Sequence, residues 1–194
     1  EPVAPDALPH GVSLEQWALI LKHHTIPFIS YPYEWSFSML KDAALLHLDL
    51  LQAALAEDMI LKDATPFNIQ WHGSQPIFID IPSFERLRDG EPWIGYRQFC
   101  QLFLYPLLLQ AYKGLPFQPW LRGSIDGVTP ADCASLMSWR DLMRPGVLSH
   151  VTLQAKMQTA YAGAVRNMKR ELYSAGFHKN MIQANVRRLT RLLQ

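Results

Sequence analysis

Three polar residues, Asp63, Asn68 and Asp80, have the types and the spacing that magnesium–nucleotide chemistry requires. Asn68 follows Asp63 by five residues, and Asp80 follows Asn68 by twelve. Carboxylate and amide oxygens are ligands that hard divalent cations take from proteins. The pattern predicts that Asn68 and Asp80 share one cation. Asp63 would then face the molecule that lies beyond this cation.

The residues between these positions are typical of a β-hairpin. Asn68–Trp71 is a short β-type run, His72–Gln75 has a turn-like composition, and Pro76–Ile79 is a second apolar run that ends at Asp80. Antiparallel pairing would bring Asp80 back beside Asn68, with the two side chains roughly 4–6 Å apart, one cation diameter plus two ligand bonds. The alternative is that Asp63 and Asp80 only cap turns, which aspartate does often.

This arrangement resembles the catalytic loop and metal-binding strand of the protein-kinase-like superfamily. The stretches LKDATPFNIQ, FIDIPSFE, GEPWIGYRQFC and YPYEWSF are also similar in wording to the kinase-like portion of bacterial S-adenosylmethionine-dependent methyltransferase proteins, some of them nodulation-related. The likeness runs from Ile26 to Leu121. The chain departs from the kinase pattern at Leu61, where the His of His-Arg-Asp would stand, and at Ile81-Pro82, where Asp-Phe-Gly would continue.

The resemblance implies an α+β, mostly helical fold: the large, carboxyl-terminal lobe of a kinase with a small β-hairpin and trailing helices. It implies that Asp63 is a catalytic base and that Asn68 and Asp80 hold Mg²⁺ on the phosphates of ATP. The aromatic segment Ile26–Trp35 corresponds to the hinge between lobes. Its residues Tyr33, Glu34 and Trp35 would then line the adenine pocket, and the alternative is an aromatic linker packed on the core.

Other parts of a kinase are missing from the sequence. Residues 1–30 cannot supply an amino-terminal lobe, no Gly-rich loop is present, and Lys22 lies in a helical context typical of a solvated face. We therefore expect residues 1–30 to be an extension or linker, 31–150 to be the kinase-like large-lobe region, and 151–194 to be a basic helical tail packed on the same domain. The first residue is Glu, which suggests a piece of a longer protein.

Two functions follow from these expectations. One is a module that handles Mg-ATP and transfers phosphate to a small-molecule or protein hydroxyl. The other is a catalytically silent, pseudokinase-like module that serves a fused methyltransferase. S-adenosylmethionine would bind only in that fused domain, because a Gly-rich strand-to-helix turn is absent here.

Hydrophobic periodicity and capping signals predict the helices. The predicted helices are Leu14–His24 with Ser13 as N-cap, Ser38–Asp58, Tyr96–Lys113 kinked at Pro106 and closed by Gly114, a helix that starts at Thr129-Pro130, Val151–Ala175 and Asn180–Leu193. Leu115–Gly127 is expected to be a loop. His47 is expected to be a polar or partly buried core residue, since no second ligand lies at i+3 or i+4.

Composition limits the partners and the compartment. Hydrophobic residues make up 49% of the chain, yet no apolar run is long enough for a membrane span. The two cysteines lack metal spacing, which favours reduced thiols and a cytoplasmic location. Residues 151–194 carry eight Lys or Arg and one acid, net +7, while the first 150 residues carry ten and sixteen, net −6. The tail therefore predicts docking on an acidic surface, including other domains of the same protein, or phosphate binding, whereas thin aromatic interleaving disfavours nucleic acid.

Overall fold

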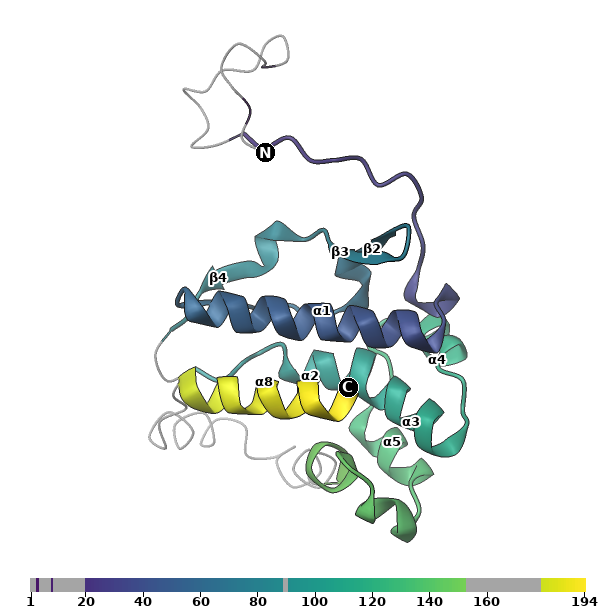
Figure 1. Ribbon diagram of the computed structural model, residues 1–194. Helices are drawn as coiled ribbons and strands as arrows, with labels where there is room; N and C mark the ends of the chain where they lie inside the picture. Colours follow the sequence, from purple (N-terminus) through teal and green to yellow (C-terminus); the bar gives the residue numbers. More distant parts are fainter. Residues whose placement is uncertain (1–2, 4–7, 9–19, 89–90, 153–178) are drawn as a thin grey trace.

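A long helix at the centre of the molecule carries the rest of the fold. The computed structural model describes residues 3, 8, 20–88, 91–152 and 179–194 (Figure 1). Helix α1, Phe37–Ala56, starts at the N-cap Ser36, whose hydroxyl accepts a hydrogen bond from the Met39 N–H. Its inner face is completely buried, as the helical spacing of its apolar residues predicts. The predicted helix Ser38–Asp58 is thus confirmed with both ends shifted by one or two residues.

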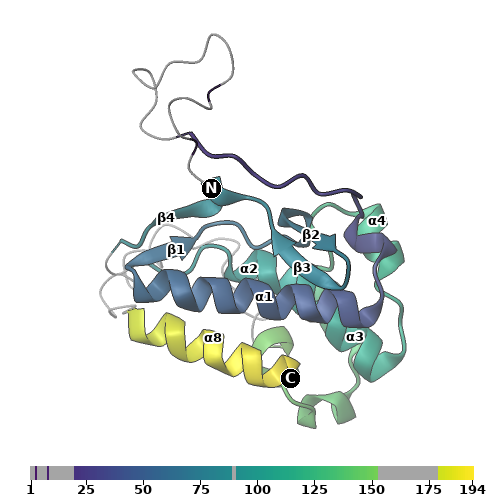
Figure 2. The ribbon, with the colours of Figure 1, turned by 45° about the horizontal axis from the view of Figure 1, so that its top comes forward.

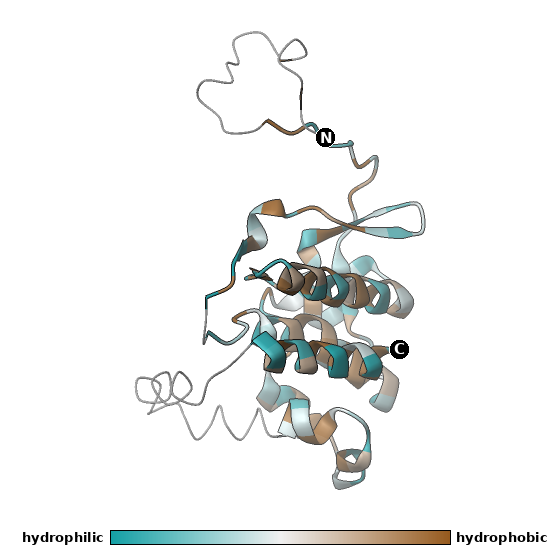
Figure 3. Cartoon of the chain, turned by 60° about the vertical axis from the view of Figure 1, so that its left-hand side comes forward, coloured by the Kyte–Doolittle hydropathy of each residue, from teal (hydrophilic) through white to brown (hydrophobic). Residues whose placement is uncertain are grey.

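Helix α8, Lys179–Leu193, lies alongside α1 (Figure 1). Ile182, Val186, Leu189 and Leu193 are buried, and the outer side of the helix is polar (Figure 3). Lys179 forms an ion pair with Asp58 at 2.6 Å, and Lys41 at the other end of α1 donates to the Gln194 carbonyl oxygen at 3.2 Å. These two contacts show that α8 runs antiparallel to α1, and the predicted helix Asn180–Leu193 is confirmed.

A second buried helical segment packs beneath α1. It consists of α2, Tyr96–Phe99, a π-helical turn, Cys100–Leu104, and α3, Tyr105–Lys113. The irregularity in this segment is the π-helical turn, which ends at Leu104, two residues before the position of the predicted kink, Pro106. Pro106 lacks an N–H and lies in the first turn of α3. Gly114, at φ 67°, adopts the left-handed conformation that ends the segment, as predicted.

The strands form two small antiparallel sheets on the side of α1 away from α8 (Figure 2). Strand β1, Met59–Leu61, pairs with β4, Phe84–Arg86. Strand β2, Ile69–His72, pairs with β3, Gln75–Phe78, in the register Ile69↔Phe78. Gly73 has φ 61°, which the tight turn between β2 and β3 requires. The predicted hairpin is confirmed, and the fold is α+β and mostly helical.

Short helices fill the remaining connections. They are the 3₁₀ turns Pro32–Glu34, Pro66–Asn68, Ile81–Ser83 and Trp139–Met143, the helices α4 (Gln118–Gly123) and α5 (Pro130–Leu136), and the π-helical turn Val147–Thr152. Thr129 caps α5 by accepting from the Asp132 N–H at 3.1 Å, as predicted. The expected loop Leu115–Gly127 is wrong in part, because α4 lies within it. Within the described residues, no helix combines the length and the apolar character needed to cross a bilayer.

Two predicted helices fall largely on residues that the structure does not describe. Residues 14–19 of the first lie outside the described residues, and 20–24 are not helical, so that part of the prediction is wrong. Ile20 instead accepts a hydrogen bond from the Val3 N–H at 2.9 Å. Residues 153–175 of the helix predicted at Val151–Ala175 also lie outside, while Val151 and Thr152 end a π-helical turn.

His47 was expected to be polar or partly buried in the core, and the structure buries it completely. Its ring is 0% exposed and lies 5.9–6.3 Å from the ring centroids of Phe78, Trp93, Phe99 and Phe103. Neither ring nitrogen has a hydrogen-bond partner among the described residues. Burial therefore lowers the pKa of His47 to about 3, and the fold contains the neutral imidazole.

We expect His47 to make the fold sensitive to acid. In the unfolded chain His47 takes up a proton below about pH 6.5, whereas in the folded chain it does so only near pH 3. Between these two pH values the free energy of unfolding therefore falls by about 1.4 kcal/mol for each pH unit as the pH drops. Burial and then Arg188 lower the pKa of His150 to about 4, which adds a similar term. Urea unfolding at about pH 7.5 and about pH 5 should show a loss of roughly 2 kcal/mol per histidine in the wild type, and His47→Leu should keep only the His150 share. Equal losses in both proteins would contradict this assignment.

Candidate functional site

The β2–β3 hairpin brings Asn68 and Asp80 together. The Ile79 N–H donates to the Asn68 carbonyl oxygen at 2.9 Å, which extends the strand pairing by one residue to the start of the candidate site. Asn68 Nδ2 then donates to Asp80 Oδ2 at 2.8 Å. The two side chains are therefore neighbours, as the hairpin predicts, but they touch directly instead of lying 4–6 Å apart.

Asp80 does not use its carboxylate to cap the turn that follows. It occupies the N-cap position of the turn Ile81–Ser83, yet its side chain accepts no capping hydrogen bond. The carboxylate points instead to the Asn68 amide across the hairpin. The turn-capping alternative therefore does not explain why an aspartate stands here.

Asp63 does not act as a cap either. The turn Pro66–Asn68 is capped by Thr65, whose hydroxyl accepts from the Phe67 N–H at 3.3 Å. The Asp63 carboxylate, which is half-buried, makes no hydrogen bond or ion pair with any described residue. A carboxylate without a structural task is available to a molecule from outside.

The backbone of Asp63 lies beside the turn that follows Asp80. The Lys62 N–H donates to the Ser83 carbonyl oxygen at 3.0 Å, and Ser83 Oγ donates to the Asp63 carbonyl oxygen at 3.5 Å. Ser83 is completely buried. These contacts place the Asp63 loop and the segment Asp80–Ser83 side by side, so the three candidate residues belong to one region of the surface.

The donor set suits Mg²⁺ only when other ligands complete it. Within the described part of the chain, no group of three or more His, Cys, Asp or Glu side chains could hold a metal ion. Asn68 and Asp80 offer one amide and one carboxylate, and rotation of the Asn68 amide exchanges its Nδ2 for Oδ1 beside Asp80. Magnesium in nucleotide sites takes one or two protein carboxylates, with phosphates and waters supplying the rest. The pair therefore fits a phosphate-bound Mg²⁺ better than a free ion.

The aromatic segment Ile26–Trp35 is extended and ends in the 3₁₀ turn Pro32–Glu34. Tyr31 and Tyr33 stack with ring centroids 5.3 Å apart. Tyr33 and Glu34 line a shallow surface pocket whose other walls are Gln118, Pro119 and Arg122 of the α4 region.

Trp35 lies apart from that pocket because it is a core residue. Its ring is 1% exposed and packs edge-on against Trp71 at 5.9 Å, and its Nε1 donates to Ser30 Oγ at 2.9 Å. A buried ring cannot form a ledge for a ligand, so the packed-linker alternative describes Trp35. A stacking surface at this segment consists of Tyr31 and Tyr33.

The backbone polar groups of the aromatic segment are largely occupied. The Gln70 side chain accepts from the Ser30 N–H at 3.0 Å and donates to the Ser30 carbonyl oxygen at 3.1 Å. Glu34 Oε2 accepts from the Tyr31 N–H at 2.7 Å, and the Trp35 N–H donates to the Pro32 carbonyl oxygen at 3.3 Å. An adenine edge would have to displace some of these bonds, and the Glu34 carboxylate already has a structural partner.

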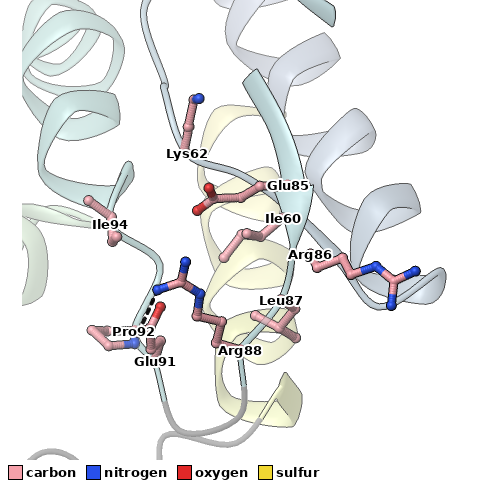
Figure 4. A pocket seen from close by; sticks show the side chains of 9 residues that line it. All are labelled: Ile60, Lys62, Glu85, Arg86, Leu87, Arg88, Glu91, Pro92 and Ile94. Carbon is pink, nitrogen blue, oxygen red and sulfur yellow. Dashed lines mark ion pairs between the residues drawn. The ribbon is translucent and has the colours of Figure 1, made fainter. Parts of the chain in front are cut away.

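A second pocket opens next to the Asp63 loop (Figure 4). Glu85 points into it from β4, and Lys62, the residue before Asp63, stands at its rim. Arg88 and Glu91 form an ion pair across its other side at 3.8 Å. The lining carries both signs of charge, so it lacks the single-sign field of a phosphate site. The sequence alone did not reveal this pocket, because its residues come from three separate stretches, 60–62, 85–88 and 91–94.

Comparison with known proteins identifies a relative among nodulation proteins. Nodulation protein NoeA of Rhizobium meliloti (strain 1021) is 43% identical over 143 residues, which cover 74% of this chain and 30% of that protein. No family model matches the chain, and no solved structure matches it. The nodulation-related part of the resemblance is confirmed. The comparisons bring no support for a kinase-like superfamily.

Proposed function

We propose that this chain is a kinase-like module that handles Mg-ATP, with residues 31–150 as its large lobe, and that it is part of a longer protein. The observation that carries the proposal is the arrangement of Asp63, Asn68 and Asp80. Two of these side chains face each other across a hairpin end, and the third has a bonded backbone and a carboxylate without a structural partner. The relative supports the longer protein, because the chain spans only 30% of its length.

Each residue has one task in this proposal. Asn68 and Asp80 would hold Mg²⁺, which would neutralise charge on the nucleotide phosphates. The Asp63 carboxylate would orient an acceptor hydroxyl and take its proton. Tyr33 and Glu34, with Tyr31 in place of the buried Trp35, would supply the surface for the adenine. The γ-phosphoryl group of ATP would pass to the oxygen of a small-molecule or protein hydroxyl, with ADP as the leaving group. Buried free thiols at Cys100 and Cys133 favour the cytoplasm as the location.

A silent module is the second candidate, and the direct contact between Asn68 and Asp80 favours it. A cation bound by both side chains would have to break the 2.8 Å hydrogen bond that joins them. Leu61, Ile81 and Pro82 replace residues of the kinase triplets. Such a module would bind a nucleotide or a partner domain, and S-adenosylmethionine would be bound by a methyltransferase domain elsewhere in the longer protein.

We expect this chain alone to bind ATP weakly and only with Mg²⁺. Metal ligands and an aromatic surface remain, while the covering lobe and its lysine are missing, so the dissociation constant should be on the order of 1 mM. NMR titration of the chain with ATP, with and without Mg²⁺, measures this affinity. The resonances of Asn68 and Asp80 should shift only in the presence of both ligands. Micromolar binding by calorimetry would contradict the incomplete site, and no metal-dependent shift at these residues would contradict the site itself.

A further inference from the structure

Two side chains near the start of the buried α2–α3 segment form hydrogen bonds to the backbone of the loop that carries Asp63. Trp93 Nε1 donates to the Leu61 carbonyl oxygen at 2.8 Å. Gln98 Oε1 accepts from the Ala64 N–H at 2.7 Å. The two hydrogen bonds therefore hold the backbone on either side of Asp63.

Ser83 forms two further hydrogen bonds to the loop backbone, between the two bonded positions Leu61 and Ala64. Its carbonyl oxygen accepts from the Lys62 N–H, and its hydroxyl donates to the Asp63 carbonyl oxygen. Four consecutive residues, 61 to 64, thus each have one backbone group bonded to a residue at least 20 positions away. An ordinary surface turn satisfies its backbone locally or with water, so this loop is unusually constrained.

Gly95 lets the helical segment approach the loop this closely. A Cβ at this position would lie 2.7 Å from Trp93 Nε1 and 3.2 Å from both the Lys62 carbonyl oxygen and the Ala64 Cβ. Leu61 and Ala64, which flank the Asp63 position, are 0% exposed. Any larger residue at 95 would push either the Trp93 ring or the loop out of place.

We infer that Trp93 and Gln98 are positioning residues for Asp63, an assignment that rests on the proposed function for its catalytic meaning. Their hydrogen bonds fix both ends of the segment Leu61–Ala64, which carries Asp63, while the Asp63 carboxylate stays unpartnered among the described residues. A catalytic base must be held within a few tenths of an ångström of its proton, because a misplacement of about 1 Å costs on the order of 100-fold in rate. Gln98 and Trp93 touch no reacting atom and act only through the loop.

Conservative substitutions separate positioning from simple packing. Gln98→Leu removes the acceptor at similar volume, while Gln98→Glu keeps an oxygen at the same place and strengthens its bond to the Ala64 N–H. Trp93→Phe removes the donor and keeps an aromatic ring against His47. Gln118→Leu is the matched control for loop order alone, because Gln118 donates to the Trp35 carbonyl oxygen at 2.9 Å, away from the loop. It is not a control for activity, since Gln118 also lines the pocket of Tyr33 and Glu34.

The first measurement is amide hydrogen exchange at residues 62–64, which needs no enzymatic activity. Gln98→Leu should speed exchange at Ala64 by at least about 10-fold beyond any change in global exchange, because that N–H loses its bond. Gln98→Glu should remain close to the wild type, and Gln118→Leu should leave Ala64 unchanged. Unaltered local exchange in Gln98→Leu would overturn the inference.

The second measurement is phosphate transfer by the full-length protein. Gln98→Leu should lower kcat by about 10- to 100-fold with the nucleotide KM unchanged, and Gln98→Glu should restore most of it. An unchanged kcat, or a loss that Gln98→Glu does not restore, would overturn the inference. If the wild type transfers phosphate to no acceptor, the proposed function fails instead, and the exchange measurement alone decides whether Gln98 orders the loop.

Discussion

Replacing Asp80 by Asn is expected to abolish magnesium-dependent nucleotide binding whether or not the protein transfers phosphate. The substitution keeps the size of the side chain and removes its negative charge, and it leaves two neutral amides at the hairpin end. Mutation of groups that only support metal ligands costs 10- to 100-fold in metal affinity, so loss of the carboxylate ligand itself should cost more than about 100-fold. Titration with Mg²⁺ and ATP, followed through the Asn68 amide resonance, measures the loss.

Two further variants identify the cause. Asp49→Asn removes an exposed carboxylate from the outer face of α1 and should leave binding unchanged. Asn68→Asp places two carboxylates in contact, which should destabilise the metal-free fold and increase the affinity for Mg²⁺. Undiminished binding by Asp80→Asn would remove the metal site. If the Asn68→Asp protein loses the same free energy of unfolding with and without Mg²⁺, the contact between residues 68 and 80 is purely structural.

The parts of the fold that depend on local sequence were predictable. Alternating short apolar runs around a turn-like stretch predicted the β2–β3 hairpin, and its length placed Asp80 beside Asn68. The apolar spacing of α1 predicted that helix, and the capping residue Thr129 predicted the start of α5. Both predictions were confirmed because residues close in the sequence determine these features. The short helix α4 was missed because Pro119 and a six-residue length leave no periodicity to detect.

The residues that hold the candidate site were not predictable in this way. Gln70 bonds to Ser30 across 40 positions, and Gln98 bonds to Ala64 across 34. A glutamine in a strand or a helix has no local signal that distinguishes a buried bond from a solvated side chain. Trp35 shows the same limit, because an aromatic residue beside Tyr33 and Glu34 is equally suited to a ligand surface or to the core. Tertiary packing decided each case.

The fold also explains why Asp63 and Asp80 can be tested independently. Asp80 bonds to Asn68 through its side chain, whereas the hydrogen bond of Asp63 to the described residues is made by its backbone. A change in the Asp63 side chain therefore removes no hydrogen bond among the described residues. The fold of an Asp63→Asn protein should be intact, and any loss of activity can be assigned to chemistry.

In a phosphotransferase, Asp63→Asn should leave nucleotide affinity nearly unchanged and lower the transfer rate by about 10²- to 10⁴-fold, the range for losing a positioned base. The amide can still orient an acceptor hydroxyl but cannot take its proton. Steady-state kinetics of the full-length protein, with Asp126→Asn as an exposed control, separate kcat from the nucleotide KM. Full transfer by Asp63→Asn would remove the catalytic assignment. If wild type and variant both bind Mg-ATP and neither transfers phosphate to any hydroxyl acceptor, the site binds without reacting, and the free carboxylate of Asp63 is left to contact a partner domain of the longer protein.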